Sequence, residues 1–449
     1  MKKITLIFGL IAWAIPANAC IDCTGTGSNI NFTGIITAST GSFGTLLFGN
    51  STSAVTGSAY NLHNSTTDAL LGVLDSRPFT DIIVGTAGTK GIDATVTSLE
   101  QFNLVLASFN ARGLTYSTTV QGTIHFRNGL YNLSGATVPH GINVVCSDSV
   151  TFQMTGITGN IMTIYGTVGM GGGFPCIMDA GNQAFIGRPV SIRGSAQVNL
   201  TLVGGAKQAN AVDNCSFVDV QNSTRSGGSL WFKDFTTVTG FTSRGWNQTF
   251  YVNNSTDISY FVRSSTFVPN NTADATGAFS YIANCLNCDL TYDAEDAKLN
   301  WVLLDGNLRN VNIYGRISVS TGHVLDDAGI VGFLGDSTKP FGNPSSTSTV
   351  KIDVTVLVFG VGTANAMNIF HASDLPNGIV VNGVEISGRI VCYGAGNNVN
   401  AVRLGSTDYN RVNIHDLIVN GCLGSTLVDS ATNTLYQIYK DGALVTNYP

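Results

Sequence analysis

Residues 122–146 of the 449-residue chain read GTIHFRNGLYNLSGATVPHGINVVC. Short runs of strand-forming residues, such as Gly122–Phe126 and Ile142–Cys146, are separated here by Gly, Asn, Ser and Pro, which favour turns. The same pattern of short β runs between Gly, Asn, Asp and Ser continues to about residue 425. This part of the chain is therefore predicted to be all-β.

One helix is predicted upstream of this region. Residues 97–100, Thr-Ser-Leu-Glu, match a capping box in which Glu100 acts as the capping carboxylate. Apolar side chains then recur at spacings of three and four, at Leu99, Phe102, Leu106 and Phe109. Gly113 stands where a helix stop belongs. We expect a helix over residues 98–111 that plugs the open end of the β region.

Three similar β runs point to a repeating architecture. They begin at Asn310, Val381 and Arg411, and the last two stand about one coil of a β-solenoid apart. Such a spacing is typical of a solenoid, in which each coil buries its apolar face against its neighbours. A two-sheet sandwich is the alternative. A sandwich region of this length would be expected to divide into domains of ordinary size, whereas the sequence pattern here does not change along the region.

Residues 122–146 and the helix before them resemble the opening coil of the pectate-lyase-like superfamily, which includes many phage tailspikes. In that family a helix is followed by a glycine, a strand, a second glycine, a tyrosine and a further strand. Those places are held by Gly122, Ile124, Phe126, Gly129, Tyr131, Leu133 and Val138. The resemblance implies a right-handed parallel β-helix. It implies no single activity, because this fold carries lyases, hydrolases, esterases and inert adhesins.

The N-terminus is predicted to be a signal peptide over residues 1–19. Two lysines precede the apolar run Ile4–Pro16, and Ala17-Asn18-Ala19 forms a cleavage site. We expect a secreted or cell-surface protein without a transmembrane segment, in which Cys20 is a candidate for a lipid anchor. Residues 20–80 are expected to be a Ser/Thr/Gly-rich β extension or linker, 81–425 the parallel β-helix, and 426–449 a C-terminal cap or tail.

Charge and cysteine usage narrow the function classes. The net charge of −6 argues against nucleic acid or an anionic membrane as the partner. Nine cysteines in an exported chain favour disulfides, and Cys392 and Cys422 stand about one coil apart. The C-x-x-C pair Cys285 and Cys288 has no histidine at ligand spacing, so neither a metal nor a cofactor is expected.

Acidic residues mark the predicted catalytic region. Only three glutamates occur, and Glu295 lies in the densest acidic cluster, residues 293–296. The spacing of Glu295 and Asp327 is close to the suggested coil length, so stacked coils would bring them together as general acid and base. The candidate proton-transfer residues are Glu295, Asp296, Asp326, Asp327 and His323. The alternative is that the aspartates are turn residues, namely Asp293, Asp296, Asp305, Asp326 and Asp327, and that His323 only makes a hydrogen bond within a loop.

Substrate-binding candidates surround this cluster. Trp246 and Trp301 can pack against the apolar face of a sugar, although tryptophan is also a common core residue. Arg309 and Arg316 can clamp a carboxylate, or they can be solvated surface charges. The glycine-rich run 169–173 lacks the residues of a phosphate loop and is interpreted as a flexible turn.

The leading hypothesis is a secreted carbohydrate-active β-helix that binds, and as a hydrolase or lyase cleaves, a polysaccharide or cell-surface glycan. The rival is a non-catalytic adhesin or tailspike-like receptor-binding protein. A homotrimer would favour that rival, whereas the signal peptide counts against a tail protein assembled in the cytoplasm. A structural lipoprotein anchored through Cys20 is the third hypothesis.

Overall fold

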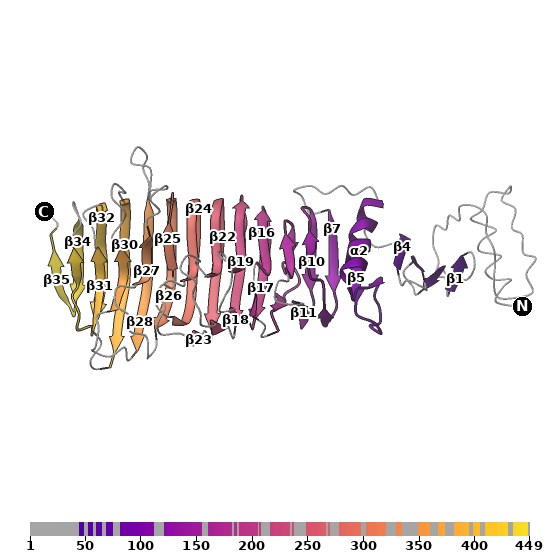
Figure 1. The fold of residues 1–449 in the computed structure, drawn as a ribbon, viewed down its shortest axis with the longest axis horizontal. Coiled ribbons are helices and arrows are strands. Elements are labelled where there is room, and N and C mark those ends of the chain that lie inside the picture. Colours follow the sequence, from indigo (N-terminus) through magenta and orange to yellow (C-terminus); the bar gives the residue numbers. More distant parts are fainter. Residues whose placement is uncertain are drawn as a thin grey trace, which may run out of the picture.

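The computed structural model of the chain describes residues 45–48, 53–56, 60–64, 69–74, 81–111, 121–154, 160–181, 184–185, 188–204, 206–207, 216–233, 236–237, 248–265, 268–269, 278–297, 302–319, 329–334, 349–359, 367–372, 381–394, 398–404, 409–429 and 434–447. From Asp81 onward these residues form a parallel β-solenoid, with α2 (Leu99–Ala111) at its N-terminal end (Figure 1). The all-β parallel solenoid predicted from the sequence is therefore confirmed.

The longest stack of parallel strands runs the length of the solenoid. Its members are β5 (Asp81–Gly85), β7 (Gly122–Phe126), β10 (Ile142–Cys146), β13 (Thr167–Val168), β17 (Gln197–Val203), β20 (Gly227–Lys233), the second halves of β22 (Gln248–Ser265) and β24 (Ala278–Ala297), β26 (Arg309–Val319), β28 (Val350–Phe359), β30 (Val381–Tyr393), β32 (Tyr409–Asn420) and β34 (Leu435–Lys440). β6 (Ala94–Thr95) pairs with β5, and β35 (Ala443–Thr446) closes the stack antiparallel to β34.

Two further stacks complete the coils. One consists of β8 (Gly129–Tyr131), β11 (Val150–Gln153) and β14 (Cys176–Asp179), which leads into β17. The other comprises β9 (Ala136–Val138), β12 (Met162–Ile164), β16 (Val190–Gly194), β19 (Ser216–Ser223), the first halves of β22 and β24, β25 (Val302–Asp305), β27 (Gly329–Leu334), β29 (Met367–Ala372), β31 (Val399–Leu404) and β33 (Leu427–Asp429).

Two small sheets lie outside these stacks. β1 (Thr45–Phe48), β2 (Ser53–Thr56), β3 (Tyr60–Asn64) and β4 (Ala69–Leu74) form an antiparallel sheet in the predicted extension. β15 (Ala184–Phe185), β18 (Ala206–Lys207), β21 (Thr236–Thr237) and β23 (Val268–Pro269) form a parallel one. No helix among the described residues is long and apolar enough to cross a membrane.

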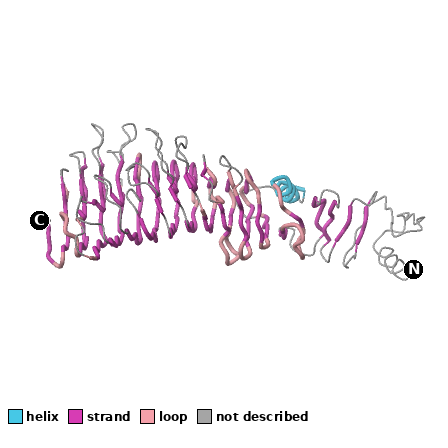
Figure 2. The backbone as a smooth tube through the Cα atoms, turned by 60° about the horizontal axis from the view of Figure 1, so that its bottom comes forward, coloured by secondary structure: helices cyan, strands magenta, loops and turns pink. Residues whose placement is uncertain are grey.

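The capping helix forms where the sequence predicts it (Figure 2). Phe102, Leu106 and Phe109 of its apolar stripe are buried and Leu99 is partly buried. The Phe102 ring lies 6.2 Å from that of Phe126 in β7. The cap itself differs from the prediction by one residue. The Ser98 hydroxyl accepts a hydrogen bond from the backbone N–H of Gln101. In return, the Gln101 side-chain oxygen accepts a hydrogen bond from the backbone N–H of Thr97. Glu100 is exposed and is not the capping side chain.

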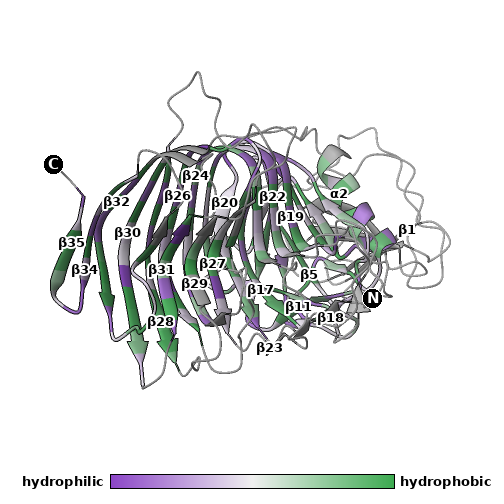
Figure 3. Cartoon of the chain, turned by 60° about the vertical axis from the view of Figure 1, so that its left-hand side comes forward, coloured by the Kyte–Doolittle hydropathy of each residue, from purple (hydrophilic) through white to green (hydrophobic). Residues whose placement is uncertain are grey.

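Strict alternation of inward and outward side chains builds the core. In β28 every second residue is buried, and Figure 3 shows the resulting stripes of apolar and polar residues along the strands. Because the strands stack in register, Val311, Val350, Val384 and Val412 form one buried row. The three sequence repeats therefore occupy equivalent places.

The register also shows that the coils differ in length. Successive steps along that valine row become shorter from β26 to β32. The step from β24 to β26 is shorter than any of these, since Asp293 pairs with Arg316. The constant coil length that was expected to stack Glu295 on Asp327 is therefore wrong for this coil, where the next strand ends at Val319.

Three disulfides reinforce the described part of the solenoid. Cys392–Cys422 joins neighbouring coils, in agreement with the spacing of about one coil between these cysteines. Cys146–Cys176 also joins neighbouring coils, near the N-terminal end. The C-x-x-C pair also forms a disulfide, between Cys285 and Cys288. Such bonds stabilise chiefly by restricting the unfolded chain.

Candidate functional site on the lateral face

The outward residues of the longest stack form a continuous surface from β20 to β30, which we call the lateral face. Outward residues alternate with buried ones along each strand, so they lie in columns that run parallel to the solenoid axis. Adjacent members of a column are about 4.8 Å apart. Each column therefore offers a regular series of contacts to an extended ligand.

One column carries two exposed aromatic rings. Phe261 is 43% exposed and Tyr314 is 37% exposed, with Thr291 between them in register. The two rings are thus separated by two strand spacings, roughly 10 Å. From β20 to β30 the column reads Ser229, Phe261, Thr291, Tyr314, Asp353 and Ser387. We call it the aromatic column.

A hollow adjoins this column at Phe261. Ser259 and Thr291 line it beside the ring, and Arg225 and Asp257 line it from the corner where the coils turn. Arg225 and Asp257 both have positive φ, of 60° and 54°. An aromatic ring next to several hydrogen-bonding groups is the typical composition of a saccharide subsite.

The neighbouring column is charged. Trp231 lies at its start, with the Lys233 ammonium 3.3 Å and the Arg263 guanidinium 4.7 Å from the ring centroid. Arg263 also pairs with Asp293, at 3.6 Å between Nε and Oδ2. The column continues through Arg316, Thr355 and Arg389. We call it the charged column.

The lateral face carries both signs of charge in close alternation. Lys351 pairs with Glu385 at 3.3 Å, and the Asn312 amide donates to Asp289 at 2.6 Å. These contacts place acidic, basic and amide side chains next to one another, so charges of both signs are interspersed on the face. The face is therefore suited to a ligand rich in hydroxyl groups rather than to a uniformly charged polymer.

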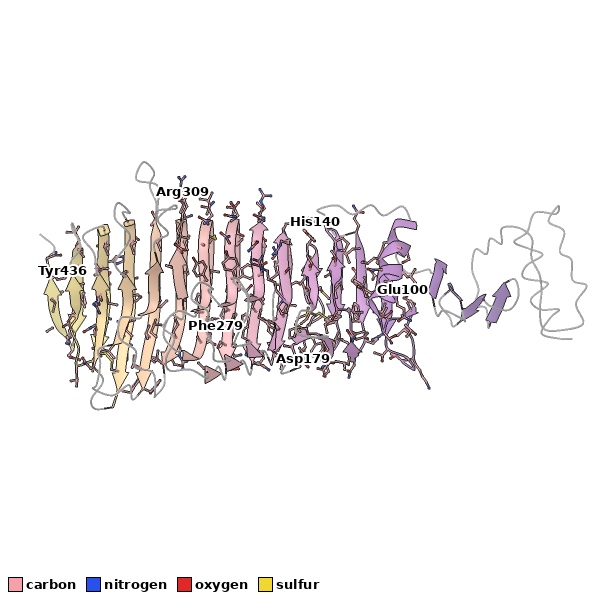
Figure 4. The ribbon with its side chains drawn as sticks, in the orientation of Figure 1. Glu100, His140, Asp179, Phe279, Arg309 and Tyr436 are labelled. Carbon is pink, nitrogen blue, oxygen red and sulfur yellow. A yellow bond between two sulfur atoms is a disulfide. The ribbon has the colours of Figure 1, made fainter. Side chains whose placement is uncertain are left out.

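Four of the predicted site residues lie in the described part of the chain. Glu295 is exposed near the end of β24, two residues beyond Asp293 and on the same side of the strand. Asp296 follows in the same strand. Arg316 is exposed in the charged column, as a ligand-facing residue must be. Arg309 instead lies at the start of β26, at the edge of the stack (Figure 4).

The interpretation of the aspartates as turn residues fails for some of them and holds for another. Asp293 and Asp296 lie inside β24 and not in a turn, so that interpretation is wrong for both. Asp305 does end a strand. Its carboxylate accepts hydrogen bonds from the Gly306 N–H and from the Tyr281 hydroxyl. The remaining predicted residues lie outside the described part of the chain: Trp246, Trp301, His323, Asp326 and Asp327.

A buried ionic cluster lies in the stack of strands that contains β16 and β19. Asp219 in β19 is fully buried and accepts from Arg193 at 2.5 Å and from Arg188 at 3.1 Å. Burial, followed by the Asp219 carboxylate, raises the pKa of Tyr251 in the next coil. Sequence reasoning missed this cluster, because its members are scattered singly along the chain.

The described residues contain no group of three or more histidine, cysteine, aspartate or glutamate side chains arranged to hold a metal ion. No protein-family model, curated protein or solved structure matches the chain.

Proposed function

We propose that this protein is exported and binds a polysaccharide along its lateral face. The observation that carries the proposal is the aromatic column, in which Phe261 and Tyr314 stand exposed and in register with a hydrogen-bonding threonine between them. Sugar rings pack their apolar faces on such side chains while their hydroxyls bond to polar neighbours. The two rings can contact two separate units of one extended glycan.

The disulfides support export. Two of them join cysteines on neighbouring coils, and such bonds persist in oxidising compartments outside the cytosol. The signal peptide predicted over residues 1–19 points the same way. Attachment of a lipid at Cys20 remains a separate proposal, which mass spectrometry of the mature N-terminus tests directly.

The test is a binding assay on the purified mature protein with a panel of neutral and acidic polysaccharides, by affinity electrophoresis. We expect Phe261→Ala with Tyr314→Ala to weaken binding to a recognised glycan by about tenfold or more, since each lost ring contact costs roughly 1 kcal/mol. Leu104→Ala, which truncates an exposed side chain on α2, is the control and should bind like the parent. Retention of full affinity by the double variant would remove the lateral face from the proposal.

Cleavage by the same face is the second candidate function. Asp293 and Glu295 project from one side of β24, which places two carboxyl groups on the same face, as a general acid and base require. In this second proposal Asp293, which pairs with Arg263, is the base and Glu295 is the acid. Asp296, Asp326, Asp327 and His323 remain proposed participants.

Product analysis separates cleavage from recognition. Reducing ends report hydrolysis, and ultraviolet absorbance of unsaturated sugars reports lyase activity. We expect Glu295→Gln to abolish any release while glycan binding persists. If the parent binds a glycan but releases nothing from it, the protein is an adhesin or receptor-binding spike, and sedimentation then tests the homotrimer that the spike hypothesis proposes.

A further inference from the structure

A second hollow lies on the longest stack near its N-terminal end, well before the lateral face begins. Strands β5, β7 and β10 form its base, and the segment before β14 forms a wall. Four of its lining residues can take part in chemistry or binding: Asp81, His125, Arg127 and Ser147. Phe174, which is 46% exposed, contributes an apolar surface.

The glycine-rich run 169–173 builds the wall of this hollow. Gly172 lies so close to β10 that a Cβ would meet the Val145 side chain at 2.5 Å. The N–H of Gly169 donates to the Val144 carbonyl at 2.8 Å, and the Cys146–Cys176 disulfide ties the end of the segment to the same strand. The run does turn the chain, as the sequence suggested, with positive φ at Gly169, Gly171 and Gly173, and its end is covalently anchored.

An acid–base pair stands in the hollow. His125 and Asp81 project outward from neighbouring strands, with 3.5 Å between Nε2 and Oδ2. Both side chains are more than one third exposed, so a ligand and water can reach them. Catalytic contacts of this kind are often long in the unliganded protein and shorten when substrate binds. Because Nε2 faces the carboxylate, Nδ1 is left to take a proton.

Arg127 contributes a cation to the lining of the same hollow. Arg127 follows β7 two residues beyond His125, and among the described residues no carboxylate forms an ion pair with it. A guanidinium in that position can bond to a developing oxyanion. The Ser147 hydroxyl oxygen is enclosed, which makes it inaccessible to an incoming carbonyl carbon, so the proposed nucleophile is a water molecule and not this serine.

We propose that this hollow hydrolyses short-chain acyl esters, an activity independent of glycan binding on the lateral face. His125 removes a proton from water as the water oxygen bonds to the ester carbonyl carbon, and Arg127 stabilises the oxyanion. The carbonyl then re-forms as the alkoxide leaves with the proton from His125, giving a carboxylic acid and an alcohol. Asp81 positions the imidazole. Two glycines and the Phe174 ring shape the hollow for a short, apolar acyl group.

The chain supplies a matched control for this reaction. His415 lies 3.5 Å from Asp416, and its side chain is 38% exposed, as is that of His125. It lines none of the hollows described above. Any general reactivity of an exposed histidine–aspartate pair should therefore be the same at both positions, and activity specific to the hollow should depend on His125 alone.

The experiment measures hydrolysis of 4-nitrophenyl acetate and 4-nitrophenyl octanoate by the full mature chain. We expect His125→Gln to lower kcat/KM for the acetate ester by about a hundredfold, and Arg127→Gln to lower kcat by about tenfold with KM little changed. His415→Gln should match the parent, and the octanoate should react more slowly than the acetate. Circular dichroism confirms that each variant is folded.

Three outcomes would overturn the proposal. The first is a parent rate no higher than that of His125→Gln, and the second is an equal loss in His415→Gln. The third is unchanged turnover in Arg127→Gln together with equal rates for the two esters. Because the Phe261 and Tyr314 variants leave this hollow intact, failure of the glycan proposal would not affect any of these readings.

Discussion

Removing the buried carboxylate of Asp219 should destabilise the solenoid strongly. Asp219 is fully buried and bonds two guanidinium groups, and Arg193 is also held by the backbone carbonyls of Ile192 and Asp219. In Asp219→Ala these cations keep their places but lose their counter-charge. Breaking a buried ion pair from one side typically costs about 3–5 kcal/mol.

The size of the effect also follows from the individual contacts. A hydrogen bond to a charged group contributes about 1.5–3 kcal/mol, and Asp219 accepts one from each arginine. Arg188 is 33% exposed, so its share is partly screened by solvent, whereas Arg193 is 19% exposed. We therefore expect a loss of about 3–4 kcal/mol in the free energy of unfolding.

Urea denaturation followed by circular dichroism measures this loss. Asp353→Ala, at an exposed position on the lateral face, is the control and should change stability by less than about 0.5 kcal/mol. The triple variant Arg188→Met, Arg193→Met, Asp219→Leu should be more stable than Asp219→Ala, because no uncompensated charge remains. An Asp219→Ala protein as stable as the control variant would refute this reasoning.

Three further changes have defined outcomes. Replacing Cys392 and Cys422 by serine should lower the unfolding free energy by about 3.5 kcal/mol, as urea titration without reductant can show. Burial raises the pKa of Tyr131 to about 12, so this tyrosine alone should lower stability by about 1.4 kcal/mol per pH unit between pH 10 and 12, and Tyr131→Phe should reduce the measured slope by that amount, while the buried Tyr260 and Tyr292 contribute in the same direction. Alanine at Gly388, where a Cβ would meet a backbone oxygen at 2.3 Å, should cost about 1–3 kcal/mol more in thermal unfolding than alanine at Gly394, which has open space.

The fold was predictable because its determinants are local and repeated. Three sequence signals indicate strands stacked behind a capping helix: alternating apolar residues, frequent turn-forming residues and one amphipathic segment. Each signal can be recognised within a short segment of the sequence. The cap was misplaced by one residue because Glu100 and Gln101 both suit the capping role. Only the hydrogen bonds between Ser98, Thr97 and Gln101 decide between them.

The candidate site was harder to predict because it depends on register. A constant coil length placed Glu295 beside Asp327, whereas the coil that follows Asp293 is much shorter than that spacing requires. Phe261 and Tyr314 looked like ordinary strand residues, and only stacking places them in one exposed column. Register in turn depends on connections of variable length, which local patterns do not specify.

The hollow at His125 shows the same limit. Asp81 and His125 lie far apart in the chain, on either side of the capping helix, and nothing in the sequence links them. The glycine-rich run that follows them suggested only flexibility. Its role as a wall depends on the Cys146–Cys176 disulfide and on contact with Val145, which are tertiary features.

The straightness and register of the lateral face can be measured in solution by double electron–electron resonance. Spin labels at Ser229→Cys and Ser387→Cys, with Cys20, Cys23 and Cys215 changed to serine, mark two positions five strand spacings apart on the aromatic column. In-register stacking predicts a single narrow distribution centred at about 24 Å. A broad distribution, or a mean distance far from this value, would contradict the in-register stacking on which the binding surface depends.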